Sequence, residues 1–297
     1  MFYEHTFLKR QASSDTKLES AIVVLTSAES KRLIAKAVAT LPEVTAVLQN
    51  GTLVITRGST NALIAEEILG RTIGYKGDFV SGVICRGELN ASRGDIKMSP
   101  FVLRDGKFSE IHARVALRDF KPGDVFIKGA NAVDVRGDIG ILVAAQTGSM
   151  TNDAWFGVTG RGADFICPVG LEKLVLSVSE AARKCCMFRF KYSMGLPCSL
   201  IPFSNAKVVT EVQAIQVLSG ANAIHVASGG IDGSEGAVTL VLEGEASILE
   251  QAFELVKSVK GEPLLSPPRQ YSNPPAASLE YDPHRLSETV QDQTKRP

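Results

Sequence analysis

The feature that most constrains the fold of this chain is a repeated unit of apolar run, short turn and amphipathic helix. The run at 21–25 reads AIVVL, and Thr26 behind it opens a capping box for a helix. A second run at 53–56 passes through Gly58 into a helix that ends at Gly70. Strands that alternate with helices in this way are typical of a parallel sheet covered by helices. We therefore expect both runs to be buried strands of such a sheet.

The same rhythm returns after residue 120. Apolar runs at 125–128, 139–145 and 163–167 are predicted strands of the same sheet, and the longest helical periodicity covers 171–185. Between the two parts, Asp105-Gly106 predicts a hairpin turn, and the segment HARVAL at 112–117 predicts another strand. We expect an α/β ligand-binding domain at 20–204, doubly wound around a mostly parallel sheet and preceded by an N-terminal arm at 1–19.

A second, smaller unit is predicted at 205–265. A strand at 207–210, a helix, strands at 223–227 and 237–242, a helix at 247–259 and a short strand at 264–265 follow one another. This order predicts a ferredoxin-like α+β domain. The segment 266–297 is rich in Pro, Ser, Asn, Gln and charge, and predicts a disordered tail.

Charge and cysteine content argue against several classes of function. The 32 Lys and Arg residues balance the 32 Asp and Glu residues, so no overall basic field favours nucleic acid as a partner. The five cysteines lack the Cys-x-x-Cys spacing of a zinc site, and we expect neither a metal nor another cofactor. No signal peptide or membrane span is evident, which predicts a cytoplasmic protein without a membrane partner. The sequence leaves open whether the chain forms a homo-oligomer.

The turn behind the run at 53–56 is the strongest candidate for a binding site. It consists of Arg57, Gly58, Ser59, Thr60 and Asn61. Glycine lets a ligand approach the backbone, the N–H groups at a helix start attract negative charge, and arginine binds phosphate or carboxylate through two nitrogens. We therefore expect these residues to hold a small anionic ligand. The alternative is that Ser59 or Thr60 only caps the helix.

A second group of candidates follows the run at 125–128. Lys128 is a candidate to bind the anion or to take part in proton transfer, and Gly129 and Asn131 are candidate ligand contacts. Asp134 is a candidate acid or base. The alternatives are a lysine that reaches solvent from the end of a strand and an aspartate with an ordinary role in a turn.

Two further candidates come later in the chain. Gln146, Thr147 and Gly148 follow the run at 139–145, which would place them at the carboxyl edge where parallel sheets bind ligands. Glu172 lies in the first turn of the next predicted helix. It is a candidate catalytic acid or base, although a glutamate there also favours the helix dipole without any chemistry.

Three segments together resemble one superfamily. The first segment covers residues 30–70 and contains TRGSTN. The second covers residues 124–141 and reads DVFIKGANAVDVRGDIGI. The third covers residues 170–175 and reads GLEKLV. The superfamily joins ribose-5-phosphate isomerase A, glucosamine-6-phosphate deaminase, DeoR-type effector domains and CoA transferases. The resemblance implies that Gly58, Ser59 and Thr60 form the turn that grips the ligand. It also implies that the residues Lys128, Gly129, Asn131 and Asp134 belong to the second ligand-binding strand.

This resemblance leaves three functions open. The first is an isomerase-like enzyme acting on a phosphorylated sugar or a similar small polyol, in which Lys128 and Asp134 or Glu172 transfer the proton. However, the D-G-A-D-E type of acidic cluster found in ribose-5-phosphate isomerases is absent from this sequence. The second is a CoA transferase relative with Glu88 as its nucleophile. The third is a non-catalytic protein that senses a ligand.

Overall fold

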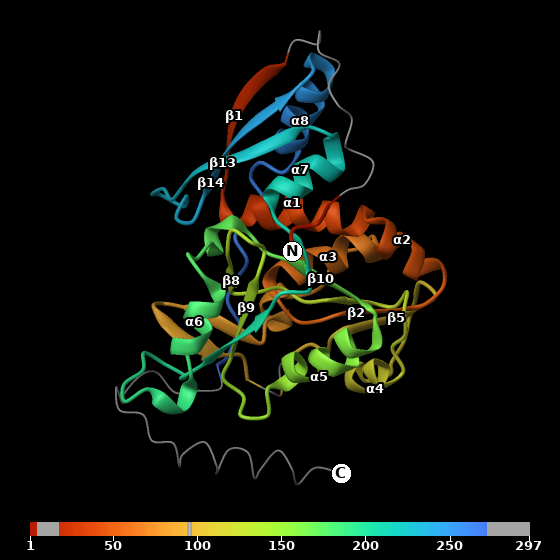
Figure 1. Ribbon diagram of the computed structural model, residues 1–297, viewed down its shortest axis with the longest axis vertical. Helices are drawn as coiled ribbons and strands as arrows, with labels where there is room; N and C mark the ends of the chain where they lie inside the picture. The colour runs from red at the N-terminus through yellow and green to blue at the C-terminus, as the bar shows by residue number, and fades with distance from the viewer. Residues whose placement is uncertain (5–17, 94, 96, 272–297) are drawn as a thin grey trace.

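A six-stranded sheet forms the centre of the molecule in the computed structural model, which describes residues 1–4, 18–93, 95 and 97–271 (Figure 1). The strand order is β12-β10-β7-β2-β5-β6, in which β12, β10, β7 and β2 are parallel, β5 pairs antiparallel with β2, and β6 pairs antiparallel with β5. The bounds are β2 (Thr52–Ile55), β5 (Phe101–Arg104), β6 (Lys107–Phe108), β7 (Val125–Ile127), β10 (Asp164–Pro168) and β12 (Lys207–Val209). The predicted strands at 53–56, 125–128 and 163–167 and the Asp105-Gly106 hairpin are confirmed.

Helices cover both faces of this sheet because its strands are apolar on both sides. Leu53 and Ile55 of β2 pack in one core, and Val54 packs in the other. The first face is covered by α1 (Ser27–Thr40), α2 (Pro42–Gln49) and α3 (Ser59–Leu69). The opposite face is covered by α4 (Ala113–Arg118) and α5 (Ser149–Gly157), which lie at the bottom of Figure 1.

A smaller antiparallel sheet lies at the top of Figure 1 and takes its strands from both ends of the chain. Its order is β1 (Glu19–Leu25), β14 (Val238–Gly244) and β13 (Asn222–Ser228), and α7 (Glu211–Ser219) and α8 (Ala246–Ser258) pack against it. The expectation that the run at 21–25 is a buried strand of the parallel sheet is wrong. Ile22 and Val24 are exposed on the outer face, and Val23 and Leu25 face the helices. The predicted strand at 207–210, in contrast, joins the large sheet as β12.

Two further antiparallel units complete the fold. β9 (Ile139–Val143) lies between β8 (Ala132–Val133) and β11 (Ser199–Phe203), and α6 (Val178–Lys184) packs on β11. The expectation that the run at 139–145 belongs to the parallel sheet is therefore wrong. β3 (Gly82–Cys85) and β4 (Glu88–Ala91) form a separate hairpin. Short 3₁₀ turns occur at η2 (Lys76–Phe79), η3 (Thr159–Arg161), η4 (Leu171–Lys173) and η5 (Met187–Arg189).

Two elements differ in type from the prediction. The segment 112–117 forms α4 rather than a strand, because Ala113, Ala116 and Leu117 are buried at helical spacing and Val115 is exposed. The continuous helix expected at 171–185 is replaced by η4 and α6. Between them the chain is extended, since the N–H of Val175 donates to the carbonyl of Val133 on β8.

Parts of both terminal segments contact the folded core. The amino group of Met1 donates to the carbonyls of Gly137 and Ala206 at 3.0 Å each. Residues 266–271, expected in a disordered tail, make contacts such as the hydrogen bond from the Tyr75 hydroxyl to Pro267. The rest of the predicted arm at 5–17 and of the tail at 272–297 lies outside the described residues. None of the described helices combines the length and apolarity needed to cross a membrane.

Candidate functional site

The loops that leave the carboxyl ends of the parallel strands meet at one edge of the large sheet. Asn61 of α3 joins two of them: its side chain is fully buried, and its Nδ2 donates to the Thr56 carbonyl at 2.9 Å and to the Ile127 carbonyl at 3.3 Å. The Oδ1 of Asn61 is also buried but has no hydrogen-bond partner among the described residues. It lies 3.9 Å from the point where a Cβ on Gly129 would stand. This edge therefore holds an acceptor that the protein itself leaves unsatisfied.

The first turn of α3 has no side-chain cap. Gly58 is the N-cap residue, and its N–H donates to the Phe79 carbonyl at 2.8 Å. Ser59 and Thr60 are the first helical residues, so the alternative that one of them caps the helix is wrong. The described residues provide no acceptor for the N–H groups of Ser59, Thr60 or Asn61. These N–H groups at the positive end of a helix dipole suit an anion.

Three cationic side chains lie in or near the turn that leads into this helix, and none of them forms an ion pair or side-chain hydrogen bond with a described residue. They are Arg57, Lys97 and Lys128. Burial lowers the pKa of Arg57, and repulsion from Arg114 adds to this effect. The pKa of Lys97 is lowered by burial and by repulsion from Arg57. Burial also lowers the pKa of Lys128 to about 8, with Cys167 opposing the shift and Arg57 adding to it. An anion bound here would offset all three shifts.

Two carboxylates stand close together beyond this group. Glu172 lies in η4 behind β10, and Glu211 is the first residue of α7 behind β12. Both carboxylates lie against Gly170, which has no side chain. A Cβ atom at Gly170 would collide with Oε2 of Glu172 and would lie 3.1 Å from Oε1 of Glu211. Both of these oxygens are buried, and neither has a hydrogen-bond partner among the described residues. The other oxygen of Glu211 accepts the N–H of Leu171 at 2.9 Å.

The two carboxylates differ in acidity. Burial and repulsion from Glu172 raise the pKa of Glu211 to about 7. Burial has the same tendency at Glu172, but the charges of Lys173 and Lys31 outweigh it and lower the pKa of that carboxyl. Lys31 of α1 reaches to 3.5 Å from Oε1 of Glu172. An ionised carboxyl beside one that is only partly ionised at neutral pH is an arrangement suited to general acid–base catalysis.

The loops behind β7 and β10 are in contact, which places the cations and the carboxylates on the same edge. The carbonyl oxygen of Pro168 lies 3.4 Å from the point where a Cβ on Gly129 would stand. Pro168 is followed after one residue by Gly170, which the two carboxylates crowd. Thr60, Lys128 and Glu172 are therefore carried by neighbouring loops of one sheet edge.

The structure brings some predicted residues together and separates others. Arg57, Gly58, Ser59, Thr60, Asn61, Lys128, Gly129 and Glu172 lie on the loops of this edge. Asp134 does not lie there. Its oxygens accept hydrogen bonds from the N–H groups of Arg136, Asp138 and Val178 at 3.0–3.2 Å. Burial alone would raise the pKa of this carboxyl, but these hydrogen bonds outweigh burial and lower it. Both oxygens of Asp134 thus hold a turn and the start of α6.

The other separated residues belong to the antiparallel unit around β9. Oδ1 of Asn131 accepts the N–H of Leu142 at 3.0 Å, which is a contact within that unit. Gln146 and Thr147 are exposed, and Gly148 precedes α5. The reason for placing them at the carboxyl edge is wrong, because β9 is not a strand of the parallel sheet. Glu88 opens β4 in the separate hairpin.

Sequence reasoning missed three residues of the site. Lys97 lies in a glycine-rich segment with no readable periodicity, and its place beside Arg57 depends on the tertiary fold. Glu211 follows the capping residue Thr210 and has the sequence signature of an ordinary helix start. Lys31 resembles any exposed lysine of an amphipathic helix, and only the packing of α1 against the sheet brings it to Glu172.

No known protein family, curated protein or solved structure matches this chain. Within the part of the chain that the structure describes, no group of three or more His, Cys, Asp or Glu side chains is placed to hold a metal ion.

Proposed function

We propose that the protein binds a small anionic metabolite, with its phosphate or carboxylate at the start of α3. The observation that carries this proposal is the group of three cations around an uncapped helix start, with no described carboxylate paired to any of them. Burying positive charge without a partner is unfavourable, and a bound anion would remove that cost. Arg57 supplies a two-pronged donor, Lys97 and Lys128 supply point charges, and the N–H groups of α3 supply directional bonds.

A phosphate fits this set of donors better than a carboxylate. It carries up to two negative charges and several acceptor oxygens, which is what three cations and a row of N–H groups can satisfy. This ligand class agrees with the resemblance of the sequence to the ribose-5-phosphate isomerase superfamily, which we retain as a proposal. It also agrees with the unsatisfied Oδ1 of Asn61, which is available to accept a hydrogen bond from a hydroxyl of the ligand.

We further propose that the protein is an isomerase-like enzyme, because the paired carboxylates stand on the same edge as the anion site. Glu172, held ionised by Lys31 and Lys173, is the base that removes a proton from carbon or oxygen of the bound metabolite. Glu211, protonated near neutral pH, maintains the charge balance beside it. Among the described residues, no observation favours the CoA transferase alternative. The sensing alternative differs from the enzyme only in lacking proton transfer.

We also retain two finer structural descriptions as proposals. The helices on both faces of the parallel strands support a doubly wound arrangement of the larger unit. The succession α7, β13, β14 and α8 supports a ferredoxin-like smaller unit.

Ligand binding is tested by calorimetry and thermal shift with phosphate, sugar phosphates, CoA esters and nucleotides. Arg57→Met should weaken binding of the best phosphorylated ligand by about tenfold or more, since a hydrogen bond to a charged group contributes about 1.5–3 kcal/mol. Arg71→Met is the matched control, because this exposed arginine lies just past the other end of α3. The proposal fails if no phosphorylated ligand binds, or if both variants bind equally well.

Proton transfer is tested separately by incubating the bound metabolite in D2O and following deuterium incorporation by NMR. We expect incorporation with the wild type, and none with Glu172→Gln at a ligand concentration that saturates the site. Glu180→Gln, on the exposed surface of α6, serves as the control. Binding without deuterium incorporation in the wild type would favour the sensing alternative over the enzyme.

A further inference from the structure

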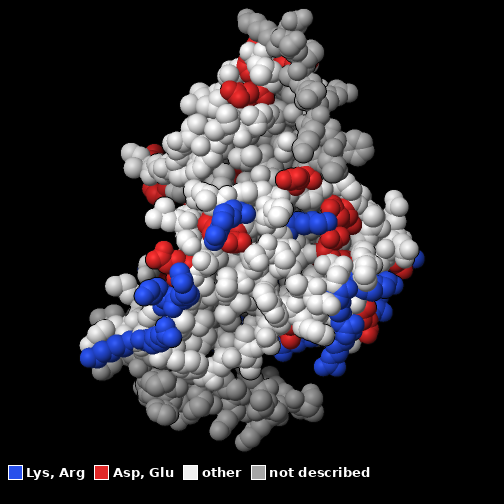
Figure 2. Space-filling view, viewed as in Figure 1, with Lys and Arg blue, Asp and Glu red and all other residues white. Residues whose placement is uncertain are grey.

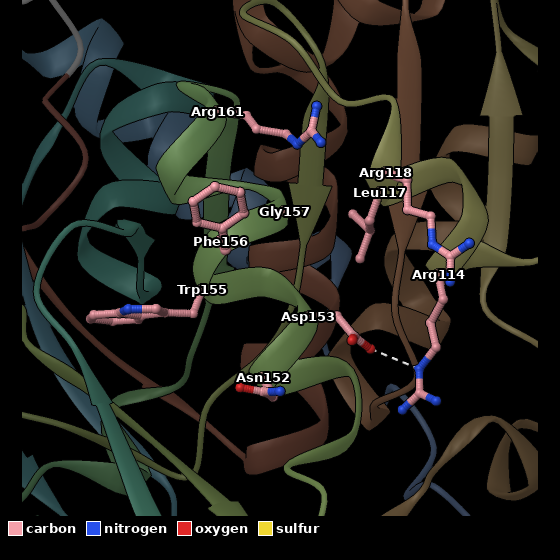
Figure 3. A pocket seen from close by; sticks show the side chains of 9 residues that line it. All are labelled: Arg114, Leu117, Arg118, Asn152, Asp153, Trp155, Phe156, Gly157 and Arg161. Carbon is pink, nitrogen blue, oxygen red and sulfur yellow. Dashed lines mark hydrogen bonds and ion pairs between the residues drawn. The ribbon is translucent and has the colours of Figure 1, made fainter.

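A groove of about 490 Å³ lies between α4 and α5, on the face of the sheet opposite α3 (Figure 3). Arg114, Leu117 and Arg118 line it from α4, Trp155 and Phe156 line it from α5, and Arg161 lines it from η3. In Figure 3, Phe156 and Leu117 lie across from each other, with Arg161 above the space between them and Arg118 beyond Leu117. The groove thus combines apolar and cationic side chains.

The charge of the groove is positive and largely unpaired. Asp153 also lines it, but its carboxylate accepts a hydrogen bond from Nε of Arg114 at 2.7 Å. The guanidinium groups of Arg118 and Arg161 form no ion pair or hydrogen bond with any described residue. Figure 2 shows a group of Lys and Arg side chains over the part of the molecule that Figure 1 labels α4 and α5, with few acidic side chains among them. An anionic group is the partner that this charge would favour.

The aromatic rings of the groove are held in place and remain open to solvent. The ring of Trp155 meets that of Phe203 edge to face, with 5.0 Å between the centroids, yet 54% of Trp155 is exposed. Phe156 is 72% exposed and lies against Gly160, where a Cβ would stand 3.0 Å from its ring. Exposed aromatic side chains on a surface commonly mark a binding site. Rings of this kind next to arginine are suited to stacking against a flat, electron-rich ligand.

We propose that this groove binds a free mononucleotide, with its base stacked on Phe156 and its phosphate between Arg118 and Arg161. A volume of about 490 Å³ lies within the range of small-molecule sites. The zero net charge of the chain favours a mononucleotide over a nucleic-acid strand, whose binding requires a more extended basic surface. The groove is a second site, distinct from the start of α3, and its Arg114 lies near enough to Arg57 of the anion site for the two charges to repel each other.

The test uses intrinsic fluorescence, because Trp155 is the only tryptophan of the chain. Purine and pyrimidine monophosphates and diphosphates are titrated into the full-length protein, with free tryptophan as the correction for absorbance. We expect saturable quenching by at least one nucleotide. The corresponding nucleoside and ribose 5-phosphate should each bind about tenfold more weakly, since one lacks the phosphate and the other the base.

Substitutions locate the site. Phe156→Leu and the double variant Arg118→Met/Arg161→Met should each weaken binding by about tenfold, while Arg71→Met leaves it unchanged. All of the substituted groove residues are exposed, and unfolding curves confirm that the variants are folded. The proposal is overturned if no nucleotide quenches at millimolar concentration, or if Arg57→Met abolishes binding while the groove variants retain it. It is also overturned if affinity rises steadily with oligonucleotide length.

Discussion

The neighbouring helices α1 and α3 differ in how completely they satisfy their own polar groups. Each helix begins just past the end of a strand; Arg32 lies in the second turn of α1, and Arg57 immediately precedes the N-cap residue of α3. In α1, Thr26 and Glu29 form a reciprocal capping box, and Arg32 donates to three carboxylates on Glu66, Glu67 and Glu262 at 2.8–2.9 Å.

At the start of α3, the N–H groups and Arg57 have no such partner among the described residues. Gly58, the N-cap residue, has no side chain that could cap the helix, and no carboxylate of the described residues pairs with the guanidinium of Arg57. Where partners are supplied within the chain, as in α1, the arrangement stabilises the fold. Where the described residues supply none, as in α3, the ligand that we propose would take their place.

The largest expected difference between the two helices is in stability. Arg32→Met should lower the free energy of unfolding by about 3 kcal/mol, because it removes the cation that pairs with Glu262 and leaves Glu66 and Glu67 with only Lys76 and Lys36. Arg57→Met should change it by less than about 0.5 kcal/mol, or raise it, since no partner is lost. Urea unfolding of the two variants measures both values. Equal losses would show that the comparison is mistaken.

A second comparison concerns two buried carboxylates, Glu66 and Glu211. Oxygens of Glu66 accept hydrogen bonds from Arg32 and Lys76 at 2.8 Å, and these partners outweigh burial and lower the pKa of that carboxyl. The pKa of Glu211, in contrast, is raised from 4.5 to about 7. Between these two values the native state binds more protons than the unfolded state at this site. The contribution of Glu211 to stability is therefore lost as the pH rises through that window.

Glu211→Gln should consequently stabilise the protein at pH 8 by up to about 3 kcal/mol, at about 1.4 kcal/mol for each unit of pKa. Glutamine keeps an acceptor for the N–H of Leu171 and offers an N–H to the unpaired oxygen of Glu172. The gain should shrink toward pH 4.5, where the wild-type carboxyl is itself protonated. Urea unfolding at pH 5, 6.5 and 8 measures the trend. A gain that does not vary with pH would rule out titration of Glu211 as its cause.

The pH dependence of anion binding is the next smaller effect. The pKa of Lys128 is about 8, so its ammonium is charged below that pH and neutral above it. Sulfate stays a dianion throughout, and its affinity should be constant from pH 6 to 7 and fall by up to about tenfold per pH unit above 8. Calorimetry gives the profile. Lys128→Arg should remove the fall, and a wild-type profile that stays flat to pH 9.5 would exclude Lys128 from the site.

The smallest effect sharpens the comparison at the helix start itself. Gly58 has an extended backbone, with φ 162°, and a Cβ there would meet only ordinary contacts with Asn61 at 3.7 Å or more. Gly58→Ser should therefore give α3 the cap that α1 already has, and raise the free energy of unfolding by a few tenths of a kcal/mol. The new hydroxyl competes for the N–H groups, so affinity for sulfate should fall. Higher stability with unchanged affinity would mean that these N–H groups do not bind the anion.

Sequence predicted the features that depend on neighbouring residues. The capping box at Thr26, the helix end at Gly70 and the turn at Asp105-Gly106 are all confirmed, because each is determined within a few residues. The partner of β1 is not local: β1 pairs with β14, more than two hundred residues away. An apolar run such as AIVVL fits a buried or an edge strand equally well.

The same limit applies to the candidate site. The turn at Gly58 could be predicted because strand, glycine and helix adjoin in the sequence. Lys97 and Glu211 could not, since only the tertiary fold brings one beside Arg57 and the other beside Glu172. Asp134 was misleading for the opposite reason. Its sequence context fits a catalytic aspartate and a turn aspartate equally, and the hydrogen bonds that distinguish them come partly from Val178 on a distant segment.

Whether the start of α3 is an anion site is tested most directly by anomalous diffraction from crystals soaked in selenate. We expect a selenium peak within hydrogen-bonding distance of the N–H groups of Ser59 and Thr60 and of the Arg57 guanidinium. We also expect the peak to disappear in Arg57→Met crystals. Selenium peaks confined to other parts of the surface, or a peak at α3 that persists without Arg57, would contradict an anion site built on these residues.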